Sequence, residues 1–289
     1  MGLVRNLLLF RVPAKFIRKT MKNKKGFTFG IITSRGTGSY LERCIKSIEN
    51  LKIDPDRYEI IIVGDCGIES SDKIKIIPFD ETKKNLWITK KKNIITLESC
   101  FENICFLHDY VSLEEGWYEG FLRFGNDWDI CMNPISNLDG TRCIDWMGLP
   151  DDPVHGNVML PYDYKGSEGM YIPGYYWVAK RDLMVDFSLN EDFVWNEGED
   201  IEWSKRVLGG YPQRWLKNLA DFENGIIKIK KHKYVLNTLS KVVFLKQKDV
   251  HPNFRNPYDL HSGKESRPLK STKENYYYLN FNQDPSRLS

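Results

Sequence analysis

Apolar runs alternate with amphipathic stretches through the first half of the chain. Continuously apolar runs are typical of strands that are covered on both faces, and they predict strands at residues 27–34, 58–65, 74–80 and 103–110. Between these strands, the sequence pattern predicts helices at residues 36–51 and 89–99. This alternation predicts an α/β fold with a mostly parallel central sheet that is flanked by helices.

Polar side chains follow the predicted strands at the point where each run of apolar residues ends. These residues are Thr33, Ser34 and Arg35 after the first strand, Asp65 after the second, and His108, Asp109 and Tyr110 at the end of the fourth, in the stretch NICFLHDYVS. Because the carboxyl ends of parallel strands meet at one edge of a sheet, ligands bind there in such folds. We therefore expect one polar cleft at this edge. The alternative is that polarity simply returns at the end of any strand.

Composition is that of an ordinary globular protein. The 289 residues are 41% hydrophobic and 13% aromatic, which suffices for one large domain or two small ones. Six cysteines are scattered without a CxxC pair, and several lie in apolar runs, as is typical of reduced core thiols. The cysteine pattern favours a cytoplasmic location.

Positive charge is concentrated at the amino terminus. Residues 1–25 carry eight Lys or Arg and no acid, which leaves 34 basic against 39 acidic residues in the rest of the chain. As a helix, this arm would be amphipathic, and its apolar runs are too short to span a bilayer. It is predicted either to lie on an anionic membrane surface, as a peripheral contact, or to be a disordered or docked leader. The slightly acidic body makes nucleic acid an unfavourable partner.

Several short motifs occur in an order that resembles one enzyme family. The segments FGIITSRGTGSYLERCIKSIEN, YEIIIVGDCG, TKKKN, FLHDYV and GEDIEWSKRV resemble the nucleotide-sugar glycosyltransferases of the A-type fold, in particular the inverting family 2. The resemblance covers roughly residues 27 to 210. It implies one glycosyltransferase domain at 26–256, with a Rossmann-like nucleotide-binding half and an acceptor-binding half, between the arm at 1–25 and a polar tail at 257–289. A sugar nucleotidyltransferase is the alternative on a similar sheet, whereas no GxGxxG motif supports a dinucleotide-binding domain.

The resemblance also implies which residues bind the nucleotide, for which UDP is expected while GDP and TDP remain open. The expected nucleotide contacts are Thr33, Ser34, Arg35, Asp65, Lys92, Asn93 and His108. Lysines 90–92 could instead form only a solvated helix face.

A divalent metal is a further expectation from the family. Its members usually hold Mn²⁺ or Mg²⁺ with two carboxylates after the fourth strand, whereas this chain has His108 and Tyr110 on either side of a single carboxylate, Asp109. Asp109 and the distant His251 are the expected metal ligands, since carboxylate and imidazole both suit Mn²⁺. The alternatives are that His251 is a surface histidine and that lysines neutralise the diphosphate.

The segment WNEGEDIEWSKRV matches the family's Glu-Asp signature. By resemblance, Asp200 is the general base that removes the acceptor proton, and Glu199 binds the acceptor or is the reserve base. Acids are also common at helix starts because the helix dipole favours them. Gly174 and Tyr175 are expected to face the donor sugar. Trp146 and Trp177 are expected either to stack on sugar or to pack in the core.

The sequence thus predicts an inverting hexosyltransferase that moves sugar from a nucleotide diphosphate to a glycan, lipid-linked or protein-linked acceptor, for example in polysaccharide biosynthesis. The contrasting interpretation is a catalytically inactive module that binds nucleotide or glycan, which the replacement of acids around Asp109 favours.

Overall fold

A computed structural model describes most of the chain between residues 23 and 246. The described residues are 23–34, 39–149, 158–164, 169–208, 222–223, 226–227 and 232–246. Nearly all of the basic arm, Arg35, His251 and the polar tail lie outside them, so the expectations for these residues, and the domain boundaries, stay predictions. Within the described parts, no helix has the length and apolarity that crossing a membrane requires.

A seven-stranded sheet forms the centre of the fold, with the order β13-β6-β10-β4-β1-β2-β3. Its strands are β1 (Lys24–Ile32), β2 (Tyr58–Val63), β3 (Ile74–Ile77), β4 (Phe101–His108), β6 (Ile130–Met132), β10 (Tyr176–Lys180) and β13 (Tyr234–Leu236). β1 runs parallel to β2 and β4, and β2 runs parallel to β3. Only β10 runs antiparallel to its neighbours, β4 and β6, while β13 is parallel to β6. The predicted mostly parallel sheet is confirmed.

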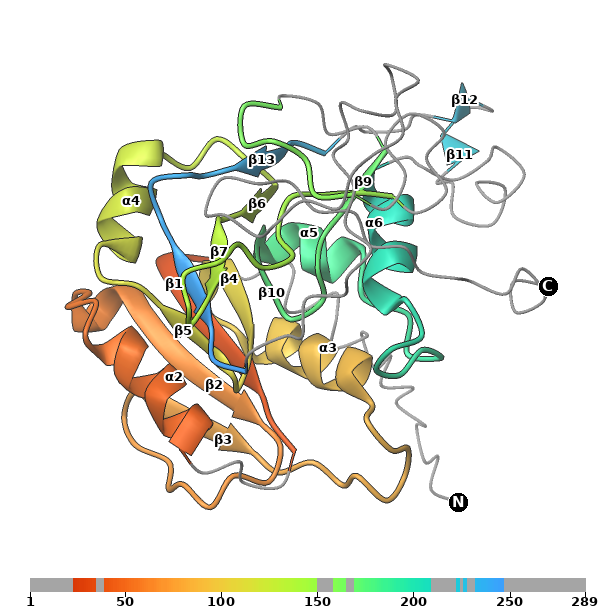
Figure 1. Ribbon diagram of the computed structural model, residues 1–289. Coiled ribbons are helices and arrows are strands. Elements are labelled where there is room, and N and C mark those ends of the chain that lie inside the picture. Colours follow the sequence, from red (N-terminus) through yellow and green to blue (C-terminus); the bar gives the residue numbers. More distant parts are fainter. Residues whose placement is uncertain are drawn as a thin grey trace, which may run out of the picture.

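Helices cover both faces of this sheet (Figure 1). They are α2 (Ser39–Glu49), α3 (Ile88–Glu98), α4 (Trp117–Phe124), α5 (Arg181–Asp186) and α6 (Glu199–Leu208), together with the short 3₁₀ helix η1 (Pro55–Arg57). In Figure 1, α2 and α4 lie to the left of the sheet, and α3, α5 and α6 lie to its right. The predicted strands and helices of the first half are all present, with ends that differ by a few residues.

The alternation of side-chain direction along β1 explains how helices pack on both faces of the sheet. The rings of Phe27 and Phe29 contact the indole of Trp117 in α4, at centroid distances of 5.3 and 5.6 Å. Gly30 points to the opposite face, where a Cβ atom would come within 2.3 Å of the Ile95 side chain in α3. Successive strand residues face opposite sides of a sheet, so the missing side chain of Gly30 allows α3 to pack closely on β1.

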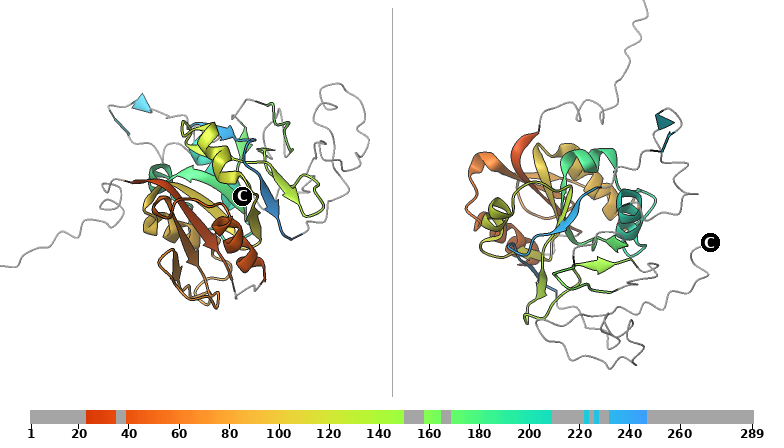
Figure 2. Two further views of the ribbon diagram at one scale, coloured as in Figure 1. Left: turned by 90° about the vertical axis from the view of Figure 1, so that its left-hand side faces the viewer. Right: turned by 90° about the horizontal axis from the view of Figure 1, so that it is seen from above.

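Smaller sheets extend the second half of the chain. They are formed by β5 (Val111–Leu113), β14 (Val242–Phe244) and β7 (Ile135–Asn137), by β8 (Met147–Gly148) with β9 (Met170–Tyr171), and by β11 (Phe222–Glu223) with β12 (Ile226–Ile227). β14 lies between β5 and β7, antiparallel to the first and parallel to the second (Figure 2). The N–H of Leu245 then donates to the carbonyl of Tyr110 at 2.8 Å. This hydrogen bond holds the segment after β14 beside the turn that follows β4.

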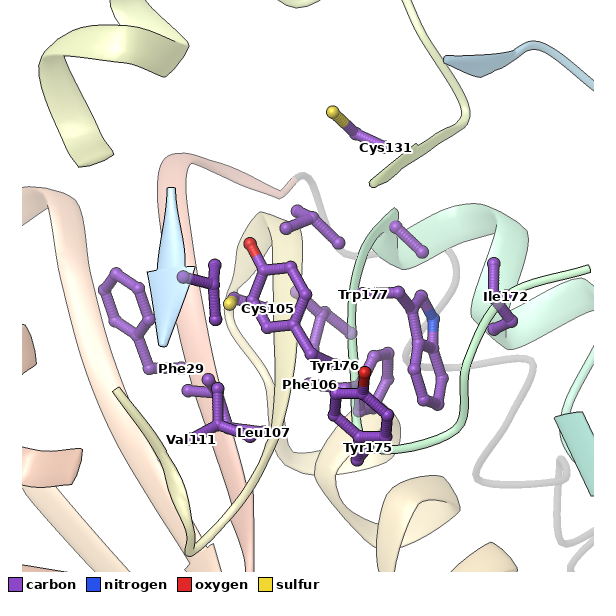
Figure 3. Close-up of a cluster of buried hydrophobic side chains, with 14 of the residues drawn as sticks. Phe29, Cys105, Phe106, Leu107, Val111, Cys131, Ile172, Tyr175, Tyr176 and Trp177 are labelled. Atoms are coloured by element: carbon purple, nitrogen blue, oxygen red, sulfur yellow. The ribbon is translucent and has the colours of Figure 1, made fainter. Parts of the chain in front are cut away.

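The core around the sheet contains many aromatic residues (Figure 3). Trp177 of β10 stacks on Phe106 of β4 with centroids 4.6 Å apart, and it contacts Trp203 of α6 at 6.2 Å. All three side chains are fully buried. The six cysteines are free thiols, as predicted, and all but Cys100 are buried.

A buried ion pair organises the irregular segment between β7 and β9. Arg142 donates from Nε and from one terminal nitrogen to Asp145 Oδ1, at 2.9 and 2.6 Å. The other carboxylate oxygen accepts from the N–H of Ile135 at 3.1 Å and from the hydroxyl of Tyr162 at 2.6 Å. Because both charges are paired and hydrogen-bonded, their burial is tolerated, and the segment is tied to the sheet.

Candidate functional site

The carboxyl ends of β1 and β4 meet at one edge of the sheet. The hydroxyl of Thr33 donates to Asp109 Oδ2 at 2.7 Å, and the N–H of Asp109 donates to the carbonyl of Ile32 at 3.2 Å. Both polar side chains are buried. The predicted meeting of these strand ends is confirmed, and the Asp109 carboxylate is partly engaged in joining them.

The beginning of β10 lies at the same edge because β10 runs antiparallel to β4. The N–H of His108 donates to the carbonyl of Tyr175 at 3.0 Å, which places Gly174 and Tyr175 beside the end of β4. The Tyr175 side chain itself is buried, where its hydroxyl bonds to the carbonyl of Ile144 and contacts the Cys143 thiol. The Gly174 backbone, rather than the Tyr175 ring, is therefore the part of the segment before β10 that meets the polar cluster.

Two lysines of α3 reach this edge from the right-hand layer. Lys91 donates to the carbonyl of Thr33 at 2.7 Å and to Ser34 Oγ at 3.2 Å, and it forms an ion pair with Glu81. Lys91 and Lys92 are each only 1% exposed, so the alternative of a solvated face is wrong for both. Lys91 fixes the backbone that follows β1.

Lys92 lies at the centre of a buried group of charges. Its ammonium donates to the carbonyl of Gly174 at 2.6 Å, lies 3.9 Å from Glu199 Oε1, and is 4.6 Å from the centre of the Trp177 ring. Burial lowers the pKa of Lys92, and the carboxylates of Glu199 and Asp200 oppose that change. The buried ammonium thus has compensating charge close by.

The predicted carboxylate pair opens α6 and faces Gly174. The N–H of Gly174 donates to Asp200 Oδ2 at 2.8 Å, and the N–H of Ile201 donates to Asp200 Oδ1 at 2.9 Å. Glu199 is buried, and burial together with the Asp200 charge raises the pKa of Glu199 to about 7. Burial also raises the pKa of Asp200. A carboxyl that titrates near neutral pH can both accept and release a proton under physiological conditions.

Close packing at Gly174 depends on its missing side chain. A Cβ atom there would come within 2.7 Å of Glu199 Oε1 and 3.1 Å of Asp200 Oδ2. A larger residue would therefore force both carboxylates to shift. The glycine expected near the donor sugar is therefore the residue against which both carboxylates pack.

His108 is held as a neutral imidazole. Its Nδ1 lies 2.6 Å from the hydroxyl of Tyr110. Burial lowers the pKa of His108 well below its usual value, and the ammonium groups of Lys92, Lys246 and Lys91 lower it further. These effects indicate that several lysines surround the end of β4.

Asp65 lies on a neighbouring part of the edge. The end of β2 abuts the end of β1, since a Cβ atom on Gly64 would come within 2.1 Å of the carbonyl oxygen of Thr33. Asp65 is exposed and lines a cavity of about 490 Å³ beside the segments that follow β2 and β3. The cavity is formed by Gly64, Asp65, Cys66, Gly67, Ile68, Ile76, Pro78, Phe79 and Asp80. A hollow beside a carboxylate and an aromatic ring is suited to a small polar ligand with a flat face.

Three other expected contacts are engaged within the protein. Asn93 donates to the carbonyl of Leu189 at 2.9 Å and accepts from the N–H of Leu189 at 2.9 Å, so it fixes the loop that leads to α6. Trp146 is buried against Tyr234, with ring centroids 4.7 Å apart. Trp177 is buried as described above. For both tryptophans this placement favours the core alternative, and sugar contact stays a prediction without support from the geometry.

Metal binding has little support among the described residues. They contain no group of three His, Cys, Asp or Glu side chains that could hold a metal ion. Asp109 Oδ2 accepts from Thr33, and His108 Nδ1 is paired with Tyr110. The described donors therefore do not fit a divalent ion by themselves, and His251, the second expected ligand, lies outside them.

Two features of the site were not expected from the sequence. Lys246, directly after β14, lies with its ammonium 4.2 Å from the centre of the Tyr110 ring. The Arg142–Asp145 pair was also missed. A signal existed for Lys246, because it follows the apolar run VVFL as the other polar residues follow their strands.

Comparison with solved structures places this fold among known ones. The structure of GalNAc-T7 with UDP, GalNAc and Mn²⁺ matches with a TM-score of 0.51 and 12% identity, over 79% of this chain and 45% of that one. The structure of S. aureus TarS residues 1–349 with UDP matches with a TM-score of 0.43 and 12% identity, over 73% of this chain and 60% of that one. The chain thus spans less than two thirds of either neighbour. No protein-family model matches the chain, and no curated protein matches it in sequence.

The central sheet, its strand order and the likeness to GalNAc-T7 define a glycosyltransferase-like A-type fold. The resemblance expected from the motifs is confirmed at the level of the fold. At such low identity, the likeness shows the fold alone.

Proposed function

We propose that the protein is an inverting glycosyltransferase that transfers a sugar, expected to be a hexose, from a nucleoside diphosphate to an acceptor hydroxyl. The observation that carries this proposal is the carboxylate pair Glu199–Asp200, packed against Gly174 beside buried Lys92, at the sheet edge where Thr33 and Asp109 also lie. Acid–base groups and buried charge occur together at the edge where α/β sheets bind their ligands, and a cavity lies beside Asp65 on a neighbouring part of this edge.

The chemistry needs one proton acceptor and one stabilised leaving group. The acceptor oxygen forms a bond to the anomeric carbon from the face opposite the diphosphate, and the bond from that carbon to the diphosphate oxygen breaks. Its electron pair goes to the diphosphate, while the acceptor proton goes to Asp200. A positioned carboxylate contributes to such a step by receiving the proton as the new bond forms.

Asp200 is the proposed base because two backbone N–H groups fix its orientation. Each of its oxygens accepts one of these bonds and retains a further lone pair, so proton uptake remains available. Glu199, with a pKa of about 7, is the reserve base and holds charge opposite Lys92. The assignment places the reacting centre beside the Gly174 backbone.

The donor is proposed to be a UDP-sugar, with its nucleotide along Thr33, Ser34 and Asp65. The structure of GalNAc-T7 was determined with UDP, which supports the choice of nucleotide. The acceptor is a glycan, lipid-linked or protein-linked hydroxyl. A Mn²⁺ or Mg²⁺ ion held by Asp109 and His251 and a membrane contact through residues 1–25 also stay predictions.

Donor hydrolysis tests the proposal without knowledge of the acceptor. The full chain is incubated with UDP-, GDP- and TDP-sugars, and release of nucleoside diphosphate is measured for the wild type, Asp200→Asn and Glu199→Gln, with Glu197→Gln as the control. Hydrolysis uses water in place of the acceptor hydroxyl. Asp200→Asn should therefore lower the rate about a hundredfold to ten-thousandfold while donor affinity is kept.

The outcomes separate the possible assignments. Loss in Glu199→Gln alone would make Glu199 the base. Tight donor binding without turnover by the wild type would favour the inactive binding module. Activity that survives in both carboxylate variants would refute the proposed mechanism, because the charge pair would then be structural.

A further inference from the structure

Lys246 lies where three segments that are far apart in the sequence come together. It follows β14, its ammonium is 4.2 Å from the centre of the Tyr110 ring, and it is 5.9 Å from the Tyr40 ring in the first turn of α2. Tyr40 comes shortly after the end of β1, and Tyr110 directly follows the end of β4 with Asp109. The ammonium therefore lies over the carboxyl edge of the two central strands.

The position of Lys246 is fixed by the surrounding backbone and rings. The Leu245 N–H is bonded to the Tyr110 carbonyl, and the Phe244 ring packs edge-on against the Tyr110 ring at 5.1 Å. The Tyr110 hydroxyl is in turn paired with His108. A cation over an aromatic face is stabilised while its ammonium remains available to other partners.

Lys246 differs from the two lysines of α3 in having no anion beside it among the described residues. Lys91 is paired with Glu81, and Lys92 has Glu199 at 3.9 Å, whereas Lys246 is exposed and its described contacts are those with aromatic rings. A cation with no described anion beside it is suited to an anionic ligand at this edge.

A leaving diphosphate requires positive charge beside it, and the described residues at this edge offer few carboxylates that could hold a metal ion to supply that charge. Asp109 is the one carboxylate of the His-Asp-Tyr turn, and the described residues offer no three-ligand metal group. Charge on a leaving phosphate can equally be neutralised by a positioned lysine.

We propose that Lys246 binds the diphosphate of the donor directly and supplies the positive charge that a metal would otherwise bring, with Tyr110 holding the lysine in place. This inference rests on the proposed function, since it names the residue that recognises the leaving group at the same site. It assigns the His-Asp-Tyr turn a structural role: Asp109 joins β4 to β1, and Tyr110 positions the cation.

Calorimetry with nucleoside diphosphates provides the test. UDP, GDP and TDP are titrated into the full chain in chelator and in Mn²⁺, for the wild type, Lys246→Gln, Lys246→Arg and the control Lys241→Gln. Lys241 is an exposed lysine directly before β14, so the control removes the same charge from the other end of that strand. Melting temperature is recorded for each variant.

The wild type should bind one of these nucleotides in chelator. Lys246→Gln should weaken that binding about tenfold to a hundredfold, which is the usual loss for a hydrogen bond to a charged group. Lys246→Arg should restore most of it, and Lys241→Gln should change neither affinity nor melting temperature. Binding should also weaken with added salt, because the cation is exposed.

Two results would overturn the inference while leaving the proposed function intact. One is wild-type affinity in Lys246→Gln at an unchanged melting temperature, and the other is nucleotide binding that is lost in chelator and restored by Mn²⁺. If the wild type binds no nucleoside diphosphate in either condition, the proposed function itself fails, and this inference fails with it.

Discussion

Replacing Glu199 with Gln should make the stability of the protein, relative to wild type, rise as the pH increases. Folding raises the pKa of this carboxyl from 4.5 to about 7, because the side chain is buried beside Asp200. The folded protein therefore binds the proton more tightly than the unfolded chain does. The free energy of unfolding should fall as the pH rises through this window, and the stabilisation from the bound proton should be fully present only below pH 4.5.

The size of the effect follows from the change in pKa. Between pH 4.5 and about 7, the folded state carries up to one extra proton at Glu199. The corresponding slope is about 1.4 kcal/mol per pH unit, and the total loss is roughly 3 kcal/mol. Glu199→Gln keeps the shape of the side chain and removes this titration, although Lys92 then loses one of its two neighbouring carboxylates.

Urea denaturation followed by circular dichroism at pH 5.5, 6.5, 7.5 and 8.5 measures the difference between variant and wild type. The stability of Glu199→Gln relative to wild type should rise by about 2 kcal/mol from the lowest to the highest pH. Glu202→Gln, on the same helix but paired with Arg206, serves as the control and should show no such rise. A difference that stays flat with pH would refute the assignment of a raised pKa to Glu199.

Two further substitutions address the packing of the site. Gly174→Ala should lower donor hydrolysis by roughly a hundredfold, because its Cβ would displace Glu199 and Asp200; unchanged kinetics would show that the carboxylates need not contact this backbone. Arg142→Met should lower the free energy of unfolding by about 3–5 kcal/mol, since it leaves Asp145 buried without its partner. Urea denaturation should show part of this loss recovered when Asp145→Asn is added, and a loss below about 1 kcal/mol would contradict the argument.

Apolar periodicity was sufficient to predict the first half of the fold. The buried parts of β1, β2 and β4 are mostly apolar because helices cover both faces of the sheet there, and that coverage is itself the consequence of helices following strands. The meeting of Thr33 and Asp109 followed from parallel geometry alone. The sequence thus predicts that polar strand ends meet wherever the neighbouring strands are parallel.

Lysines 91 and 92 show where sequence reasoning is insufficient. In a helix they occupy adjacent positions about 100° apart, so periodicity does not suggest that both should be buried. They are buried because α3 is covered on one side by the sheet and on another by the loop before α6, which Asn93 holds in place. Their charges are tolerated because carboxylates from outside α3 lie beside them, Glu81 from the loop before the helix and Glu199 from the start of α6.

The sequence by itself determined the α/β class, the order of the first strands and helices, and the edge of the sheet at which polar residues collect. These features depend on the spacing of apolar and polar residues within short segments, which can be read directly from the sequence. Only the tertiary structure decided that Lys246 lies over Tyr110, that Glu199 lies beside Lys92, and that Trp177 is in the core. Such contacts join segments that are far apart in the chain through backbone hydrogen bonds and side-chain packing. The sequence of one segment alone has no pattern that identifies its partner segment.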